Sequence, residues 1–172
     1  MRYLVRHDQT VAEGVCYGWS DVALAVDPVD TVQRIIDQLP ANCPIISSPL
    51  SRCRLLAEQL SAARAAGDHA PVTYWEDLRE LHFGDWEGQP WDQVPRTQLD
   101  AWAQAPFSYQ LPDGESIPGF IDRVQRALDK IPDEAIVVTH GGVIRAARHL
   151  IHGEPLPTAF AATVPFASVH LF

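Results

Sequence analysis

The sequence has few of the features that mark nucleic-acid-binding or membrane-spanning proteins. Lysine is almost absent, because Lys130 is the only lysine among the 13 basic residues, and the arginines form no basic run. With 22 acidic residues the formal charge is −9, so the chain lacks the basic face that binding to nucleic acid requires. No apolar stretch approaches the roughly 20 residues of a membrane span. We therefore expect neither nucleic acid nor a membrane as a partner.

Cysteine is also scarce. The three residues Cys16, Cys43 and Cys53 form neither an even-numbered disulfide framework nor a closely spaced metal-binding pair. We therefore expect free thiols in a reducing compartment. The segment Met1–Val5 leads directly into charged residues, so we expect no signal peptide and a cytoplasmic protein. Nothing in the sequence indicates an oligomeric state.

The sequence contains short apolar runs that alternate with helical patterns. Its 172 residues, 47% hydrophobic and 20% charged, predict one folded domain over residues 1–172. Alternating strands and helices predict an α/β domain with a largely parallel sheet. We expect strands at 3–5, 45–47, 72–74, 135–138 and 167–172. We expect helices at 29–39, from Ser48 and Pro49 to a stop at Gly67, around 91–102, at 118–130, and from 141 to about 153.

Polar residues follow three of these predicted strands. Arg6 and His7 follow the first strand, Arg52 lies in the first turn of the helix after the second, and His140 follows the strand at 135–138. In open α/β sheets, ligands bind beyond the carboxyl ends of the strands. Parallel strands would therefore bring these four side chains to one edge of the sheet.

Two arginines and two histidines in one crevice favour an anion, and phosphate fits best. Guanidinium groups hold phosphate oxygens in a fixed geometry. The predicted helix starts at Ser48 and Gly141 would point backbone N–H groups at the same place. A neutral imidazole there could attack phosphorus and form a covalent phosphohistidine.

Five motifs are spaced along nearly the whole chain. They are Leu4–His7 with Thr10, Ser47–Arg52, Leu78–Gly88, Asp113–Ser116 and Val138–Arg145. In this order they resemble the signature of the histidine phosphatase, or phosphoglycerate mutase-like, superfamily. The resemblance implies a three-layer α/β/α sandwich, with no metal or organic cofactor.

The resemblance also implies roles for individual residues. His7 would be the nucleophile. Arg6, Arg52 and His140, with Gly141, would bind the phosphoryl group. Glu80 matches the family's proton donor, for which Asp85 and Glu87 are rival carboxylates.

Two positions depart from the family pattern. Asp8 follows the nucleophile where the family usually has a small residue, and Glu13 stands where it often has asparagine. Two carboxylates near a phosphate would repel it unless they point away or are neutralised. Tyr17 and Trp19, with Glu13, are expected at the rim, where the aromatic rings would either stack on a substrate or only pack.

The resemblance implies a metal-independent phosphomonoesterase that acts on a small phosphorylated metabolite. Simple hydrolysis is favoured over a mutase reaction, since phosphoglycerate mutases are longer. The runs Cys16–Gly18 and Asp21–Leu24 look like those of α-ribazole phosphatases, so α-ribazole 5′-phosphate is a candidate substrate. A non-catalytic phospho-ligand binding protein and a metallohydrolase remain alternatives. His149 and His152, three residues apart, are expected on a solvated helix face because no third metal ligand suggests itself.

Overall fold

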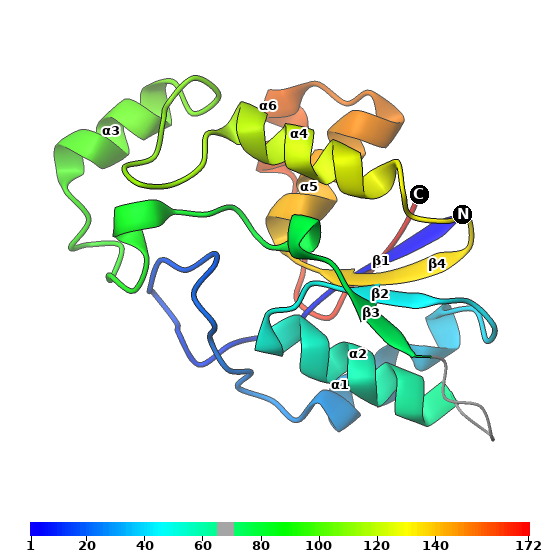
Figure 1. The fold of residues 1–172 in the computed structure, drawn as a ribbon. Helices are drawn as coiled ribbons and strands as arrows, with labels where there is room; N and C mark the ends of the chain where they lie inside the picture. The colour runs from blue at the N-terminus through cyan, green and yellow to red at the C-terminus, as the bar shows by residue number, and fades with distance from the viewer. Residues whose placement is uncertain (65–70) are drawn as a thin grey trace.

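A single mostly parallel sheet forms the centre of the molecule. The computed structural model describes residues 1–64 and 71–172. Within them, five strands pair in the order β3-β2-β4-β1-β5 (Figure 1). The first four run parallel, and β5 runs antiparallel to β1. The bounds are β1 (Arg2–Arg6), β2 (Ile45–Ser47), β3 (Val72–Tyr74), β4 (Ala135–Thr139) and β5 (Val169–Leu171).

Helices cover both faces of this sheet and make three layers, as predicted. One layer consists of α1 (Pro28–Ile35) and α2 (Ser51–Arg64), and the other contains α4 (Ile117–Leu128), α5 (Gly141–His152) and α6 (Leu156–Ala161) (Figure 1). The helix α3 (Arg96–Gln104) lies beyond the strand ends, on the left of Figure 1. Short 3₁₀ turns occur at Ile36–Gln38, Glu76–Leu78 and Gly84–Trp86. None of the helices in the described segments is long and apolar enough to cross a bilayer.

Alternation along the strands produces two hydrophobic cores. Successive side chains of a strand point to opposite faces, so Leu4 and Val5 of β1 enter different cores. The core with Leu4 is built on α4 and α5, whereas the core with Val5 is built on α1 and α2. Every residue of β4 is buried, as expected for a central parallel strand.

Local sequence signals explain where several helices begin and end. Asp27 caps α1, with Pro28 in its first turn, and Ser116 caps α4 by accepting from the Gly119 N–H. Gly153 ends α5 in the left-handed conformation, with φ of 68°, which glycine adopts without a steric penalty.

Two helix predictions need correction, and one helix was not predicted. The helix after β2 begins at Ser51 rather than at Pro49, so Ser48 is not its N-cap. The stop predicted at Gly67 lies outside the described residues. The helix α6 was not predicted, since it is short and carries Pro157 in its first turn. The predicted helix at 29–39 is α1 followed by the 3₁₀ turn.

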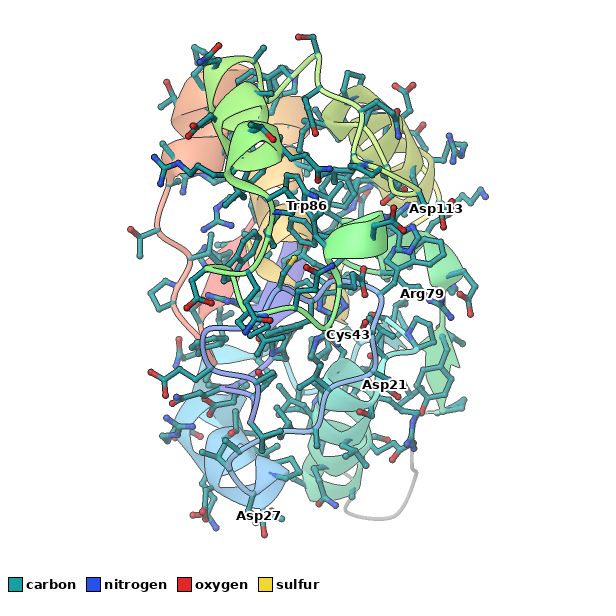
Figure 2. All side chains as sticks on the ribbon, turned by 90° about the vertical axis from the view of Figure 1, so that its left-hand side faces the viewer. Asp21, Asp27, Cys43, Arg79, Trp86 and Asp113 are labelled. Carbon is teal, nitrogen blue, oxygen red and sulfur yellow. The ribbon has the colours of Figure 1, made fainter. Side chains whose placement is uncertain are left out.

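Aromatic side chains anchor the irregular middle of the chain. Figure 2 looks onto the edge where the parallel strands end, with Trp86 in the upper part of the molecule. Trp86 is 1% exposed and its indole N–H donates to Gln98 Oε1 over 2.7 Å. Its ring packs edge-on against Trp102, with centroids 5.6 Å apart. This packing fastens the 3₁₀ turn at Gly84–Trp86 to α3, beyond the ends of the strands.

Candidate active site

The adjacent strands β2, β4 and β1 bring the predicted polar residues to one edge of the sheet. His7 directly follows β1, Arg52 lies in the first turn of α2, and His140 follows β4. A cavity of about 180 Å³ opens at this edge. Its lining residues are Arg6, His7, Val15, Tyr17, Arg52, Glu80, Phe83 and Trp91.

The His7 imidazole is held in one tautomer. Its Nδ1 lies 2.7 Å from the Asp8 carbonyl oxygen. Because a carbonyl can only accept a hydrogen bond, Nδ1 carries the proton and Nε2 keeps its lone pair. Burial, followed by the charge of Arg52, lowers the pKa of His7 to about 3. The ring is therefore neutral at physiological pH, as a nitrogen nucleophile must be.

Two arginines in this cavity have no carboxylate partner in the described segments. Arg52 is fully buried and donates to the carbonyl oxygens of Gly18 at 2.6 Å and Ser20 at 2.9 Å. Arg6 donates to the Val164 carbonyl, and burial is the main cause that lowers its pKa. The Nε atoms of both arginines are buried without a hydrogen-bond partner. Buried cations without a counter-ion are costly, so an anion bound here would stabilise both.

His140 packs against His7 and is not among the residues that line the cavity. It is fully buried, its Nε2 lies 2.8 Å from Ser48 Oγ, and its ring meets that of His7 edge-on at 5.2 Å. Burial and then the charge of Arg52 keep its pKa well below the usual value. Its direct contact with a phosphoryl group remains a prediction.

The Glu80 carboxyl lies at the start of α5. Oε2 accepts from the Gly142 N–H at 3.0 Å, and Oε1 accepts from the Leu81 N–H at 3.1 Å. A Cβ on residue 142 would lie 2.1 Å from Glu80 Oε1. Glycine at this position therefore leaves the space that the carboxyl occupies.

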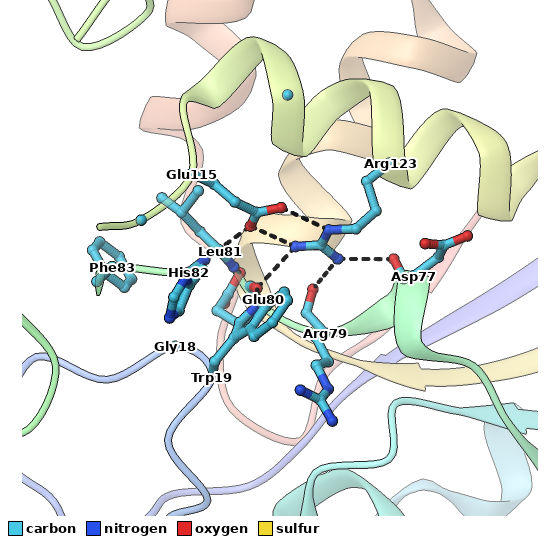
Figure 3. Close-up of polar contacts among 12 residues, drawn as sticks. Gly18, Trp19, Asp77, Arg79, Glu80, Leu81, His82, Phe83, Glu115 and Arg123 are labelled. Atoms are coloured by element: carbon cyan, nitrogen blue, oxygen red, sulfur yellow. Dashed lines mark hydrogen bonds and ion pairs between the residues drawn. The ribbon is translucent and has the colours of Figure 1, made fainter. Parts of the chain in front are cut away.

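A buried arginine holds the backbone of the segment that carries Glu80. Arg123 is 7% exposed and forms a bidentate pair with Glu115 at 2.8 and 2.7 Å. It also donates to the carbonyls of Asp77, Arg79 and Glu80 at 2.9–3.1 Å (Figure 3). Arg123 is therefore a positioning residue for Glu80.

The structure removes one of the two concerns about acidic residues. Asp8 is turned toward α1, where Thr31 Oγ1 donates to it at 2.7 Å and Arg34 forms an ion pair with it. Burial raises the pKa of Asp8, but hydrogen bonds from Thr31, the Gln9 N–H and Arg34 outweigh it and lower the pKa overall. Its charge is thus compensated away from the cavity. Glu13 is exposed and lines a neighbouring hollow that shares Tyr17 with the cavity.

The two aromatic residues expected at the rim have different positions. Tyr17 lines the cavity, and Arg52 lies over its ring at 5.1 Å. Trp19 is not among the residues that line the cavity, and its place at the substrate rim stays a prediction. Its indole N–H donates instead to the Glu80 carbonyl at 2.8 Å. Trp19 therefore supports the same backbone oxygen as Arg123.

The rival carboxylates of Glu80 are occupied elsewhere or exposed. Glu87 accepts from the backbone N–H groups of Trp19, Ser20 and Phe83 at 2.6–3.0 Å. Burial raises its pKa, but these bonds and one from the Ser20 hydroxyl outweigh it. Asp85 is exposed. Glu80 is the only acidic residue among those that line the cavity.

Sequence reasoning missed Phe166 and the role of Arg123. Phe166 packs on the Arg6 guanidinium at 3.9 Å and near the His7 ring at 5.8 Å, and no pattern in the sequence marks it. The sequence could have indicated a buried role for Arg123, because this residue lies on the same helical face as Phe120 and Ala127. A charged residue on such a face indicates a buried partner.

Within residues 1–64 and 71–172, no group of three or more His, Cys, Asp or Glu side chains could hold a metal ion. His149 Nδ1 lies 2.6 Å from the Glu154 carbonyl oxygen and so donates to it. Among the described residues, His149 and His152 therefore do not belong to a group of side chains that could hold a metal ion.

The chain resembles known proteins over nearly its whole length. The profile of the histidine phosphatase superfamily (branch 1) matches residues 2–172. Phosphoglycerate mutase-like protein 4 of Arabidopsis thaliana is 33% identical over 159 residues, which cover 83% of this chain and 67% of that protein. A phosphoserine phosphatase 2 of Hydrogenobacter thermophilus is 31% identical over 164 residues, covering 88% and 78%.

The fold is also similar to that of a solved structure. The α-ribazole phosphatase of Shigella flexneri superposes with a TM-score of 0.83, covering 98% of this chain and 87% of that one, at 22% identity.

Proposed function

Because this chain belongs to the histidine phosphatase superfamily (branch 1), we propose that it is a metal-independent phosphomonoesterase that works through a phosphohistidine on His7. One observation carries the proposal. Two guanidinium groups without a carboxylate partner in the described residues, that of Arg52 buried and that of Arg6 partly buried, share a cavity with a neutral imidazole whose Nε2 keeps its lone pair.

The first step transfers the phosphoryl group to the protein. His7 Nε2 attacks phosphorus, a P–N bond forms and the ester P–O bond breaks. Arg6 and Arg52 hold the phosphoryl oxygens, and phosphoryl transfer is mostly such positioning and charge stabilisation. Glu80 gives a proton to the leaving oxygen.

The second step returns the protein to its starting state. A water molecule loses a proton to Glu80 and attacks phosphorus, and the P–N bond breaks to release inorganic phosphate. His140 and the start of α5 at Gly141 would stabilise the charge on the phosphoryl oxygens, since helix N-termini favour anions.

For the substrate we propose a small phosphorylated metabolite in the cytoplasm, with α-ribazole 5′-phosphate as the first candidate. The runs Cys16–Gly18 and Asp21–Leu24 support that choice. The position of Asp8 speaks against the alternative of a binding protein without turnover, because its charge is neutralised by Arg34 and Thr31. A mutase would return the phosphoryl group to a second hydroxyl rather than to water.

The test follows the covalent intermediate. Protein exposed to a phosphate ester should form a phosphoenzyme that survives base and is lost in acid, and phosphate release should persist in EDTA. His7→Ala should abolish both, whereas His152→Ala, which changes an exposed histidine, should retain both. Full activity in His7→Ala, or activity lost in EDTA and restored by zinc, would overturn the mechanism. Transfer to an added alcohol instead of water would favour the mutase.

A further inference from the structure

Phe166, in the loop between α6 and β5, is a large aromatic residue that the proposed mechanism does not use. Its side chain is 39% exposed, and within the described segments it is not among the side chains that form or flank the two hydrophobic cores. The ring contacts the active site instead. Its centroid lies 3.9 Å from Arg6 Cζ and 5.8 Å from the centroid of the His7 ring.

Backbone hydrogen bonds fix the position of this ring relative to the two site residues. The Ala167 N–H donates to the His7 carbonyl at 3.2 Å, and the Arg6 N–H donates to the Ser168 carbonyl at 3.0 Å. Ala167 has a φ of 53°, in the left-handed region that is costly for residues other than glycine. Strain of this kind is common at functional sites. The turn therefore places Phe166 over the site at a cost to the backbone.

The surroundings of the Arg6 guanidinium do not favour its positive charge. Burial lowers the pKa of Arg6, the charge of Glu80 raises it, and the charge of Arg145 lowers it again. A Cβ on residue 141 would lie 3.3 Å from Arg6 Nε and 3.6 Å from Arg145 Nη1. Both guanidinium groups thus lie against the start of α5, where the helix dipole is positive. Contacts that attract the Arg6 cation are needed to keep it in place.

The face of the Phe166 ring supplies such a contact. An aromatic face carries negative potential and attracts a cation within about 6 Å of its centroid, and Arg6 Cζ lies well inside that distance. The Val164 carbonyl, two residues before Phe166, accepts a hydrogen bond from Arg6 Nη1. Arg6 Nε has no partner among the described residues. The ring and the carbonyl therefore hold the guanidinium while donors remain for an anion.

We propose that Phe166 is a positioning residue, whose aromatic face holds the Arg6 guanidinium in the orientation that receives the phosphoryl oxygens. This inference rests on the proposed function, because Arg6 acts there on the phosphoryl group. Phe166 acts through Arg6 and makes no contact with the substrate. The aromatic face, and not apolar bulk alone, is the property that matters.

The experiment compares substitutions of Phe166 that separate its bulk from its aromatic face. We expect kcat/KM for 4-nitrophenyl phosphate to fall by about 2- to 30-fold in Phe166→Ala and Phe166→Leu, the range of a cation–π contact. Phe166→Tyr keeps the aromatic face and should stay within about 2-fold of the wild type. Leu171→Ala, which removes a 53% exposed apolar side chain from β5, should leave kcat/KM unchanged. Full activity in Phe166→Leu would overturn the role of the aromatic face.

A double-mutant cycle tests whether the effect passes through Arg6. In an Arg6→Met background, Phe166→Ala should change kcat/KM by less than about 2-fold, because the cation that the ring attracts is gone. An equal loss in both backgrounds would indicate a general structural effect and overturn the positioning role. Phe166→Leu and Phe166→Tyr retain apolar bulk, so the comparison between them decides the case even where Phe166→Ala is unstable.

Binding of inorganic phosphate separates this inference from the proposed function, since it involves no turnover. Titration calorimetry should show a Kd raised by about 2- to 30-fold in Phe166→Ala and Phe166→Leu, and nearly unchanged in Phe166→Tyr. This pattern without phosphate release from any ester would overturn the phosphatase function and support the positioning of Arg6. Turnover by the wild type, with kcat/KM and Kd unchanged in Phe166→Ala, would overturn the positioning role alone.

Discussion

His7 and His140 are buried side by side near arginines, and both imidazole rings are neutral at physiological pH. Their rings lie 5.2 Å apart, and burial together with the charge of Arg52 lowers both pKa values. The proposed mechanism needs a neutral His7 ring, since a protonated imidazole cannot attack phosphorus. The same environment that keeps the His7 ring neutral therefore makes the fold sensitive to acid.

Stability should fall as the pH drops below the unfolded histidine pKa of about 6.5. The unfolded chain then takes up protons, whereas His7 in the folded protein stays neutral down to about pH 3. The stabilisation is complete above pH 6.5 and is lost on acidification toward pH 3, by about 1.4 kcal/mol per pH unit for each such histidine. Urea unfolding between pH 5 and 6.5 measures this slope.

A matched pair of variants checks the assignment. His7→Asn should reduce the slope by about one bound proton. His152→Asn, at an exposed position on α5, should keep the wild-type slope. Equal slopes in all three proteins would contradict the role of His7 in acid sensitivity.

Motifs in the sequence indicated His7, Arg6, Arg52 and Glu80, and the structure brings all four into one cavity. The hydrogen bond from Trp19 to the Glu80 carbonyl was not predicted, because the two residues lie 61 positions apart in the chain. The orientation of Asp8 depends in the same way on Thr31 and Arg34. Such contacts depend on the tertiary fold, which local patterns do not encode.

At the scale of elements, α4 is tied to the segment that carries Glu80. Arg123 donates to the backbone carbonyls of Asp77, Arg79 and Glu80. Glu115, in the loop before α4, accepts hydrogen bonds from the same guanidinium group (Figure 3). Removing one partner of a buried ion pair leaves the other uncompensated. The position of Glu80 should therefore change when Arg123 is replaced.

Arg123→Met should impair formation of the phosphoenzyme most for the ester whose leaving group needs a proton donor. General acid catalysis contributes roughly 10²–10⁴-fold, so kcat/KM for an alkyl phosphate should fall by about 10-fold or more. The kcat/KM for 4-nitrophenyl phosphate, whose leaving group needs little protonation, should change by less than about 3-fold. The measurement is kcat/KM, which reports the first phosphoryl transfer and not the later attack of water, for both esters in Arg123→Met and in Arg126→Met, an exposed arginine on the same helix.

Arg126→Met should match the wild type on both substrates. An equal loss on both esters in Arg123→Met would indicate a general structural role instead of a positioning one.

The elements themselves could be predicted where hydrophobic patterning was strong. The apolar run at 135–138 indicated β4, and the spacing in 118–130 indicated α4. The start of α2 was wrong because Ser48 bonds toward His140, a partner 92 residues away. The helix α6 has one buried residue, Ala159, and so has too little periodicity to detect.

For the whole molecule, the net charge of −9 does not describe the site. Charges farther than a Debye length, about 8 Å at physiological salt, are largely screened, whereas Arg6 and Arg52 face the cavity directly. An anion bound in the cavity would balance the positive charges of these two arginines. A ligand that binds only the folded protein also stabilises the folded state against unfolding.

Inorganic phosphate should therefore raise the melting temperature. At 100 times its Kd the gain is about 2.7 kcal/mol, which corresponds to a rise of roughly 5–10 °C for a domain of this size. Arg52→Met should abolish the rise. Arg54→Met, which removes a partly exposed arginine paired with Glu58 on the same helix, should preserve it, and a rise retained in Arg52→Met would contradict the phosphate site. Thermal unfolding followed by circular dichroism, with and without phosphate, measures the shift.

All three cysteines are buried, and this decides how the protein responds to oxidants. Cys53 lies against His140, with Sγ 3.5 Å from Nε2, and burial raises its pKa far above the usual value. Burial likewise raises the pKa of Cys16 to about 12. Oxidation and alkylation require an accessible thiolate. If the nucleophile is a histidine nitrogen and the thiols are buried, the activity should persist in the presence of peroxide. Peroxide inactivates enzymes whose nucleophile is a cysteine.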